Sequence, residues 1–533
     1  MSNEGAARRF HGSFQSAQKV LLALLAPALA ASISFAPGCA AARPVPATAE
    51  QAEAPPTERW YRVEVAGQSA GLMVERTLEE DDLLITESEM NLEFRRGGAA
   101  QKMALTSRFV ETRDHRPVSL LSSQALGARP IETHYRFTGD GVIVSGASGE
   151  TLRPLPEGEW LTPLAAQAHL EAEVLRLLGS GAPGSGIGRV EARSLDPALG
   201  LQPVTTMWVL EKPDAQLEID GELRPASLWQ QTQSFAPQVK SLVHLSPEGE
   251  LLRSATPMLG LEMVVTYVGA GPPGGDGPAA GDRAPELLVQ SFIYPDRRIP
   301  TPREARFGAY RFLVDGVASV LPTVGYQRQA GDTVLVDLEA SGSPRLEGES
   351  DARYLAASTY IPHRDAGIRA LHGRAFATES AKDPAARAER LRRLVARHLT
   401  EKNLDSVLAT AAEAATSRSG DCTEHAVLLA ALLRADGIPA RVATGVIYVE
   451  RFAGREHLFA YHMWTQALIE GRWRDLDATL EGAAAFDAAH LTLDIPDLDD
   501  EGAALMHMAA VAPLIGRASV EVLPTAPEQR SSP

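Results

Sequence analysis

Cysteine is scarce in this chain, which has only Cys39 and Cys422 among its 533 residues. Two cysteines cannot form the network of disulfides that stabilises many small secreted domains. No paired Cys-x-x-Cys spacing is present, so the sequence predicts no structural zinc site. A chain of this length exceeds one hydrophobic core, and we expect about two to four domains. Each thiol therefore needs an explanation other than structural cross-linking.

Positive side chains are outnumbered by negative ones, with 51 Lys and Arg against 68 Asp and Glu, and long apolar runs are scarce. The formal net charge is −17, which disfavours nucleic acid and anionic membrane surfaces as electrostatic partners. No stretch approaches the roughly 18 apolar residues of a transmembrane helix. A Gly-x-Gly-x-x-Gly match at Gly179–Gly184 follows a predicted helix and contains a proline. A dinucleotide-binding loop instead follows a strand and opens a helix, so we interpret this match as a turn.

The N-terminus has the pattern of an export signal. Arg8, Arg9 and Lys19 precede the short apolar run VLLALLAPALAA. A basic segment followed by an apolar core of this length is typical of a cleaved signal peptide. The sequence therefore predicts a signal peptide over 1–38 and a mature protein in the periplasm or cell envelope.

Cys39 lies at the end of this signal, where FAPGC resembles the cleavage box of a bacterial lipoprotein. A lipid on Cys39 would attach the mature chain to a membrane, with 39–58 as an Ala/Pro-rich tether. Ala36 and Pro37 fit the box poorly, and cleavage after Ala30 is the alternative. In either case Cys422 needs its own explanation.

The pattern of apolar and polar residues changes twice along the remaining chain. From Arg59 short segments alternate apolar and polar residues, as in antiparallel strands, with one helix predicted over Pro163–Leu178. Helical spacing returns in 386–399 and 404–416. The predicted organisation is a β-rich N-terminal domain at 59–285, a small β unit or linker at 286–350, a further domain at 351–498, and a C-terminal extension at 499–533.

Cys422 lies where a helix is predicted to begin. In GDCTEHAVLLAALLRADGIP, Asp421 can cap the helix and Glu424 completes a capping box, while Gly437 marks its end. The positive end of the helix dipole favours a thiolate in the first turn. Asp421 and Glu424 oppose this effect, so the thiolate needs a cationic partner.

Two strands downstream supply such a partner. A two-residue turn at Glu470–Gly471 would pair 461–469 with 472–479 and place Asp477 diagonally beside His462 on one face. Asp475 shares that face and is the competing carboxylate. A thiol, an imidazole and a carboxylate in this layout are the components of a cysteine nucleophile, its base and the orienting acid.

Three stretches together resemble the transglutaminase-like superfamily of papain-like cysteine enzymes: GDCTEHAVLLAALLRADGIPARVATGVIY, FAYHMW and GRWRDLDAT. The resemblance covers roughly residues 355–495 and places Cys422, His462 and Asp477 on the family's three catalytic positions. It implies an α+β fold, in which a buried Cys-bearing helix packs against an antiparallel sheet. An antiparallel β-rich region precedes this core in the sequence.

The same resemblance implies an exported acyl-transfer enzyme that acts on peptide or glutamine-type amides, by hydrolysis or by transamidation. Protein or peptide is then the substrate, and no cofactor or metal is needed. Pairing with His462 would depress the thiol pKa and keep alkylation of Cys422 fast near about pH 6. No tryptophan lies between residues 350 and 421, where animal transglutaminases place one, so hydrolysis is as well supported as cross-linking.

A function of another class is a binding or assembly lipoprotein that retains the fold without turnover. The complete set of Cys422, His462 and Asp477 argues against it, because a degenerate member would be expected to lose one of them. The other chemically notable residues are interpreted as structural: His425, His457, Trp464, Trp473 and Arg441.

Overall fold

The computed structural model describes residues 57–524, except 128, 147–148, 180–187, 259–260, 274–283, 289–290, 347–348, 378–381, 405, 483, 497, 499–513 and 515. The predicted signal peptide and Cys39 lie outside the described residues. The chain forms two compact units. Within the described residues the first contains 57–93, 102–124 and 132–285, and the second contains 94–101, 125–131 and 286–524.

The first unit is built on one sheet of 14 strands, in which two runs of sequential neighbours meet at β1 and β14. β1 pairs antiparallel with β2 and with β14. The strands are β1 (Thr57–Val65), β2 (Gln68–Glu80), β3 (Leu83–Arg96), β4 (Ala99–Thr112), β5 (Pro117–Ala125), β6 (Ile131–Thr138), β7 (Gly141–Gly146), β8 (Gly149–Arg153), β9 (Arg189–Leu195), β10 (Pro203–Ile219), β11 (Glu222–Gln233), β12 (Ala236–Leu245), β13 (Leu251–Met258) and β14 (Leu261–Gly269).

The alternation of apolar and polar residues explains this sheet. Along β1 every second side chain is buried, as expected when one face of a strand meets a core and the other meets solvent. The single helix predicted in this region is α2 (Pro163–Gly179), which buries Leu164, Leu170 and Val174. Both features follow the sequence pattern.

A small sheet in the second unit joins distant parts of the chain. Its strands are β15 (Phe307–Val314), β16 (Val317–Ala318), β17 (Gln327–Ala330), β18 (Thr333–Asp337) and β24 (Ala518–Val522). The order is β16-β15-β18-β17, with β24 paired to β15. A short 3-10 helix, η5 (Pro302–Glu304), precedes β15. Tyr310 and Phe312 of β15 share a hydrophobic cluster with Val446, Tyr448 and Phe459, which connects this sheet to the next one.

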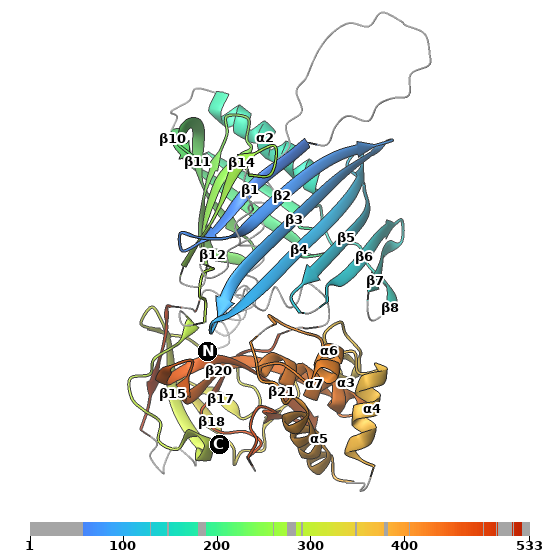
Figure 1. Ribbon diagram of the computed structural model, residues 1–533, viewed down its shortest axis with the longest axis vertical. Helices are drawn as coiled ribbons and strands as arrows, with labels where there is room; N and C mark the ends of the chain where they lie inside the picture. The colour runs from blue at the N-terminus through green and yellow to red at the C-terminus, as the bar shows by residue number, and fades with distance from the viewer. Residues whose placement is uncertain are drawn as a thin grey trace, which may run out of the picture. The chain divides into compact units, whose positions relative to one another are not determined.

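The other sheet of the second unit has the order β19-β22-β21-β20-β23. Its strands are β19 (Ser343–Pro344), β20 (Ala440–Phe452), β21 (Arg455–Ile469), β22 (Arg472–Leu476) and β23 (His490–Asp494). The helices of this unit are α3 (Asp351–Leu355), α4 (Ala366–Ala375), α5 (Pro384–His398), α6 (Ala411–Ser417) and α7 (Cys422–Ala435). In Figure 1 the helices are grouped on one side of β20 and β21 and the small sheet on the other. The predicted α+β class is confirmed.

One predicted helix is shorter than its periodicity suggested. The pattern over 404–416 predicted a helix, but α6 starts only after Thr410, which caps it in a capping box with Glu413. The preceding backbone binds other partners, because Val407 donates to the carbonyl of Leu126 and Ala409 donates to the Glu424 carboxylate. These long-range bonds compete with helix formation. No helix among the described residues combines the length and apolar composition needed to cross a membrane.

Candidate active site

The capping residues at the start of α7 fix the position of Cys422. Asp421 accepts a hydrogen bond from the Thr423 backbone at 2.8 Å, and Glu424 accepts one from the Asp421 backbone at 2.8 Å. Gly420 permits this fold-back, because its φ is +147° and an added Cβ would lie 2.4 Å from Cβ of Glu424. The local sequence therefore dictates that Cys422 is the first residue of the helix.

The thiol of Cys422 lies against strand β21. Its sulfur receives the backbone N–H of Met463, the residue after His462. One turn further along α7, the hydroxyl of Thr465 donates to the carbonyl of Ala426 at 2.9 Å and ties the helix to the same strand. Cys422 itself is half-buried. The helix start thus meets the strand at the position of the predicted base.

The hairpin that carries His462 and Asp477 has the predicted register. Thr465 pairs with Leu476 and Leu468 pairs with Trp473 across β21 and β22. The two-residue turn has positive φ at both positions, 54° at Glu470 and 72° at Gly471. Such turns match the twist of a hairpin, and only small or turn-forming residues usually adopt them. The turn forms although glutamate is not a preferred residue at its first position, Glu470.

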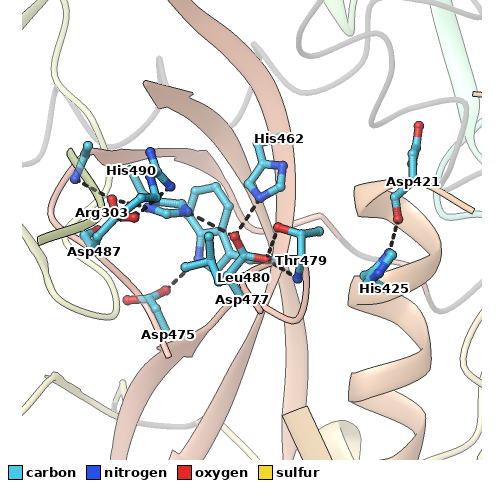
Figure 2. Close-up of polar contacts among 12 residues, drawn as sticks. Arg303, Asp421, His425, His462, Asp475, Asp477, Thr479, Leu480, Asp487 and His490 are labelled. Atoms are coloured by element: carbon cyan, nitrogen blue, oxygen red, sulfur yellow. Dashed lines mark hydrogen bonds and ion pairs between the residues drawn. The ribbon is translucent and has the colours of Figure 1, made fainter. Parts of the chain in front are cut away.

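Asp477 follows β22 and binds His462 directly. The Asp477 Oδ2 atom lies 2.9 Å from Nε2 of His462, while Oδ1 accepts the backbone N–H and the hydroxyl of Thr479 at 2.8 and 2.7 Å (Figure 2). Burial opposes ionisation of Asp477, but the charge and hydrogen bonds of His462 and His490 outweigh it and hold its pKa well below the usual range. Asp477 is therefore an ionised carboxylate aimed at the imidazole.

Asp475, the competing carboxylate, serves a different purpose. Its Oδ1 accepts the indole N–H of Trp464 at 2.8 Å and the amide of Gln466 at 2.7 Å. Its Oδ2 accepts the backbone N–H of Tyr326 at 2.8 Å. Burial raises the pKa of Asp475 despite these bonds. The side chain connects β21 to the loop before β17 and has no bond to His462 among the described contacts.

The electrostatics of Cys422 differ from the sequence-based expectation. Burial and the neighbouring Asp421 raise the pKa of the thiol well above its usual value, whereas Arg96 and the Met463 N–H lower it. Arg96 belongs to the segment 94–101 of the second unit, and its guanidinium lies 2.6 Å from Asp421 Oδ2. The direction of this shift is opposite to the depression of the thiol pKa expected from the sequence. Sequence reveals the helix dipole but not the desolvation of the thiolate.

Alkylation of Cys422 is expected to be slow at neutral pH and to accelerate with alkali. Only the thiolate reacts, so below its pKa the rate should rise about tenfold per pH unit. The second-order rate with iodoacetamide, followed by mass spectrometry of the Cys422 peptide between about pH 6 and about pH 9.5, measures this. A rate already at its plateau near about pH 6 would show a thiolate at rest and contradict the expectation.

Two neighbouring variants provide matched controls of opposite sign. Arg96→Gln removes the cation that lowers the thiol pKa and should slow alkylation at a given pH by about three- to tenfold. Asp421→Asn removes the carboxylate that raises it, keeps a good N-cap, and should accelerate alkylation. Equal rates in the two variants would show that neither charge acts on the sulfur.

The residues interpreted as structural have structural contacts. His425 is buried and its Nδ1 lies 2.6 Å from the carbonyl of Asp421. His457 contacts the hydroxyl of Tyr448 at 3.1 Å. Arg441 is buried in an ion pair with Glu349 at 2.7 Å and stacks on Trp473. Trp464 is fully buried, with its ring stacked 6.1 Å from that of His462. These contacts agree with packing roles.

Sequence analysis missed the residues behind Asp477. His490, at the start of β23, is buried, and its Nε2 lies 3.3 Å from Asp477 Oδ2. Its Nδ1 lies 3.0 Å from Asp487, which forms an ion pair with Arg303 at 2.7 Å. No motif or spacing of the sequence links these three residues to Asp477. Only the pairing of β23 with β20 brings His490 to the site.

His462, Asp477 and His490 are also residue types that bind metal ions. Candidate ligand atoms of His462, Asp477 and His490 lie within 4.8 Å of one another, a spacing compatible with a metal ion. Both nitrogens of His490 face carboxylate oxygens, with Nε2 3.3 Å from Asp477 and Nδ1 3.0 Å from Asp487. Burial opposes the charge of His490, but Asp487 and Asp477 outweigh it and raise its pKa to about 9. The contacts among the described residues are those of a hydrogen-bonded network.

A cysteine at the start of a buried helix, facing a strand with a His-Asp pair, is the arrangement of a papain-like cysteine enzyme. Residues 374–478 match the model of the Transglutaminase-like superfamily, so this part of the chain is similar to that superfamily. The family predicted from three short motifs is thereby confirmed. None of the curated proteins compared with the chain matches it.

Three solved structures are similar to parts of the chain. A putative cysteine protease from Cytophaga hutchinsonii is 19% identical over 44% of this chain and 86% of its own, with a TM-score of 0.26. The periplasmic domain of TgpA from Pseudomonas aeruginosa, bound to ethylmercury, is 17% identical over 36% and 90%, with a TM-score of 0.25. A β-barrel-like protein of unknown function from Brucella abortus is 10% identical over 40% and 94%, with a TM-score of 0.29. At these TM-scores none of the three contributes to the functional argument.

Proposed function

We propose that this chain is an exported cysteine-dependent acyl-transfer enzyme, with Cys422 as nucleophile, His462 as base and Asp477 as the carboxylate that orients the base. The observation that supports it most is the His462–Asp477 bond of 2.9 Å on the strand that receives the Cys422 sulfur. A thiol, an imidazole and an ionised carboxylate in this order are the parts that nucleophilic acyl transfer requires.

The direction of the His462–Asp477 bond assigns the roles of the two ring nitrogens. Because an ionised carboxylate only accepts, Nε2 of His462 carries the proton of that bond. Nδ1 is then the nitrogen with a free lone pair, and it takes the proton of Cys422. A raised thiol pKa favours a proton transfer that accompanies attack on the substrate.

In the first half-reaction the Cys422 sulfur bonds to the carbonyl carbon of an amide as its proton moves to His462. The negative charge that develops on the carbonyl oxygen faces the start of α7, where the Cys422 backbone N–H has no partner within the helix. The C–N bond then breaks, and the amine leaves with the proton from His462. The product is a thioester on Cys422.

In the second half-reaction water or an amine attacks the thioester. His462 removes a proton from the incoming nucleophile, the C–S bond breaks, and the Cys422 thiolate is reprotonated. Water gives hydrolysis, and an amine gives transamidation. The proposed substrate is a protein or peptide that presents a peptide bond or a glutamine-type amide. All steps use residues of this chain alone.

The proposal predicts a thioester intermediate on Cys422. Wild-type protein incubated with glutamine-containing peptides should gain the mass of the acyl group on the Cys422 peptide, and hydroxylamine should remove it. A labelled primary amine in the same reaction separates the two outcomes, because it enters the product only in transamidation. Intact mass spectrometry of the enzyme and of the peptides measures both.

The same experiment distinguishes the proposed enzyme from the alternative, a binding protein. A binding protein that retains the fold without turnover would form no thioester with any peptide of a broad library. It would, however, still capture envelope proteins with and without Cys422. The proposed location outside the cytoplasm, with or without a lipid on Cys39, depends on the N-terminal sequence alone.

A further inference from the structure

A chain of alternating charges continues behind the His462–Asp477 pair. It runs from Asp477 through His490 and Asp487 to Arg303, with successive contacts of 3.3, 3.0 and 2.7 Å (Figure 2). His490, Asp477 and Asp487 are each at most 1% exposed. An array of charges buried this deeply is costly unless every member has a partner of opposite sign. Its presence needs an explanation.

Geometry fixes the protonation of His490. Nε2 faces Asp477 Oδ2 and Nδ1 faces Asp487 Oδ1, and ionised carboxylates can only accept hydrogen bonds. Both ring nitrogens must therefore donate, which requires the imidazolium form. A neutral ring would direct a lone pair at one of the two carboxylates.

We propose that His490 is a positioning residue of this site, a buried cation that shares Oδ2 of Asp477 with His462 and so holds and partly neutralises the carboxylate that orients the base. The inference rests on the proposed roles of Cys422 and His462. Oδ2 of Asp477 is shared by two histidines, and Oδ1 is held by Thr479. The carboxylate can therefore orient His462 while part of its charge is balanced by His490.

The surroundings of His490 contain few other charges. Its ring stacks on Phe486 with centroids 4.1 Å apart and lies edge-on to Trp464, with His462 at 5.7 Å. Asp475 also interacts electrostatically with His490, and it accepts hydrogen bonds from Trp464 and Gln466. The two carboxylates that bond to His490 thus decide its charge.

His490→Gln tests the proposal without any substrate, so it is independent of whether the proposed reaction is correct. The introduced amide can still donate to Asp477 but has no charge, and the full charge of Asp477 would then favour the Cys422 thiolate–His462 imidazolium pair. We expect iodoacetamide to alkylate Cys422 at about pH 6 at least about tenfold faster than in wild type, with a rate that rises by less than tenfold per pH unit up to about pH 8. A merely loosened site would instead show the tenfold rise per pH unit of an ordinary thiol.

Two further variants make the result specific. Asp487→Asn removes the carboxylate that holds His490 charged and should change alkylation in the same direction, which covers the case in which His490→Gln does not fold. His457→Gln makes the same substitution on β21, away from the chain of charges, and should leave the wild-type profile intact. An unchanged pH profile in both His490→Gln and Asp487→Asn would overturn the proposal.

The charge on His490 has a second readout in stability. Its pKa of about 9 exceeds the unfolded value, so its contribution is complete below about pH 6.5 and is lost as the pH rises through about 9. The difference in melting temperature between wild type and His490→Gln should therefore narrow from about pH 6 to about pH 10. A melting-temperature difference that does not change with pH would show that His490 is not a cation and would refute the inference. The inference would also be refuted if the wild type bound one zinc ion per chain and His490→Gln did not.

Discussion

Cys422→Ala is expected to abolish acyl transfer and leave the protein folded. Alanine preserves the first helical position, since the bonds of the cap come from Asp421 and Glu424 and not from the thiol. Without a nucleophile no thioester forms, and we expect kcat/KM to fall by at least about 10³-fold, about 4 kcal/mol of barrier. Turnover of a peptide found in the thioester experiment, with circular dichroism as the check on folding, measures the effect.

Two companion variants separate loss of the nucleophile from local damage. Cys422→Ser keeps the size and polarity of the side chain, but its hydroxyl is a far weaker nucleophile at neutral pH. Thr423→Ser changes the adjacent residue and retains the hydroxyl that bonds to Asp421, so wild-type activity is expected. Activity of Cys422→Ala within about tenfold of wild type, about 1.4 kcal/mol, would remove Cys422 from the proposed mechanism.

The parts of this site that depend on local sequence could be predicted. Helix α7 begins and ends where the capping residues and Gly437 indicated, because caps act within one turn. The register of β21 and β22 followed from a two-residue turn, which fixes every pairing of a hairpin. These two local rules place Cys422 in the first turn of α7 and bring His462 beside Asp477.

The parts that depend on distant segments could not be predicted. Arg96 reaches Asp421 across 325 residues of sequence, and Arg303 reaches Asp487 from the segment before β15. Neither pair has a periodicity or spacing that sequence alone would reveal. The raised pKa of Cys422 has the same origin, since desolvation comes from the whole fold and the helix dipole only from α7.

The contacts that the sequence did not reveal have one chemical consequence. A thiolate–imidazolium pair at rest was expected from sequence, because only Cys422, His462 and Asp477 were visible. In the structure Asp477 is shared with His490, and the Cys422 thiolate is disfavoured by burial and by Asp421. The residues found only in the structure therefore change the expected resting state of the site while leaving the proposed order of nucleophile, base and carboxylate intact.

Asp477→Asn is expected to have the second-largest effect on activity. All four contacts of the Asp477 carboxylate are donors, two histidine nitrogens on Oδ2 and the N–H and hydroxyl of Thr479 on Oδ1. An amide offers one accepting oxygen, so its NH₂ end must face at least one pair of donors. His462 then loses its orientation and the stabilisation of its charged form. We expect kcat to fall by about 10³- to 10⁴-fold.

Asp475→Asn is the matched comparison, because the two aspartates are two residues apart and both buried. Asp475 receives bonds from Trp464, Gln466 and Tyr326, so an amide there also leaves a donor unpaired, at about 1–3 kcal/mol of stability. The loss of stability in Asp475→Asn should therefore appear as a lower melting temperature, with near-normal turnover for each folded molecule. Asp477→Asn should show the reverse, because the lost bond belongs to the base. If Asp475→Asn abolished turnover and Asp477→Asn did not, Asp475 would be the carboxylate that orients His462.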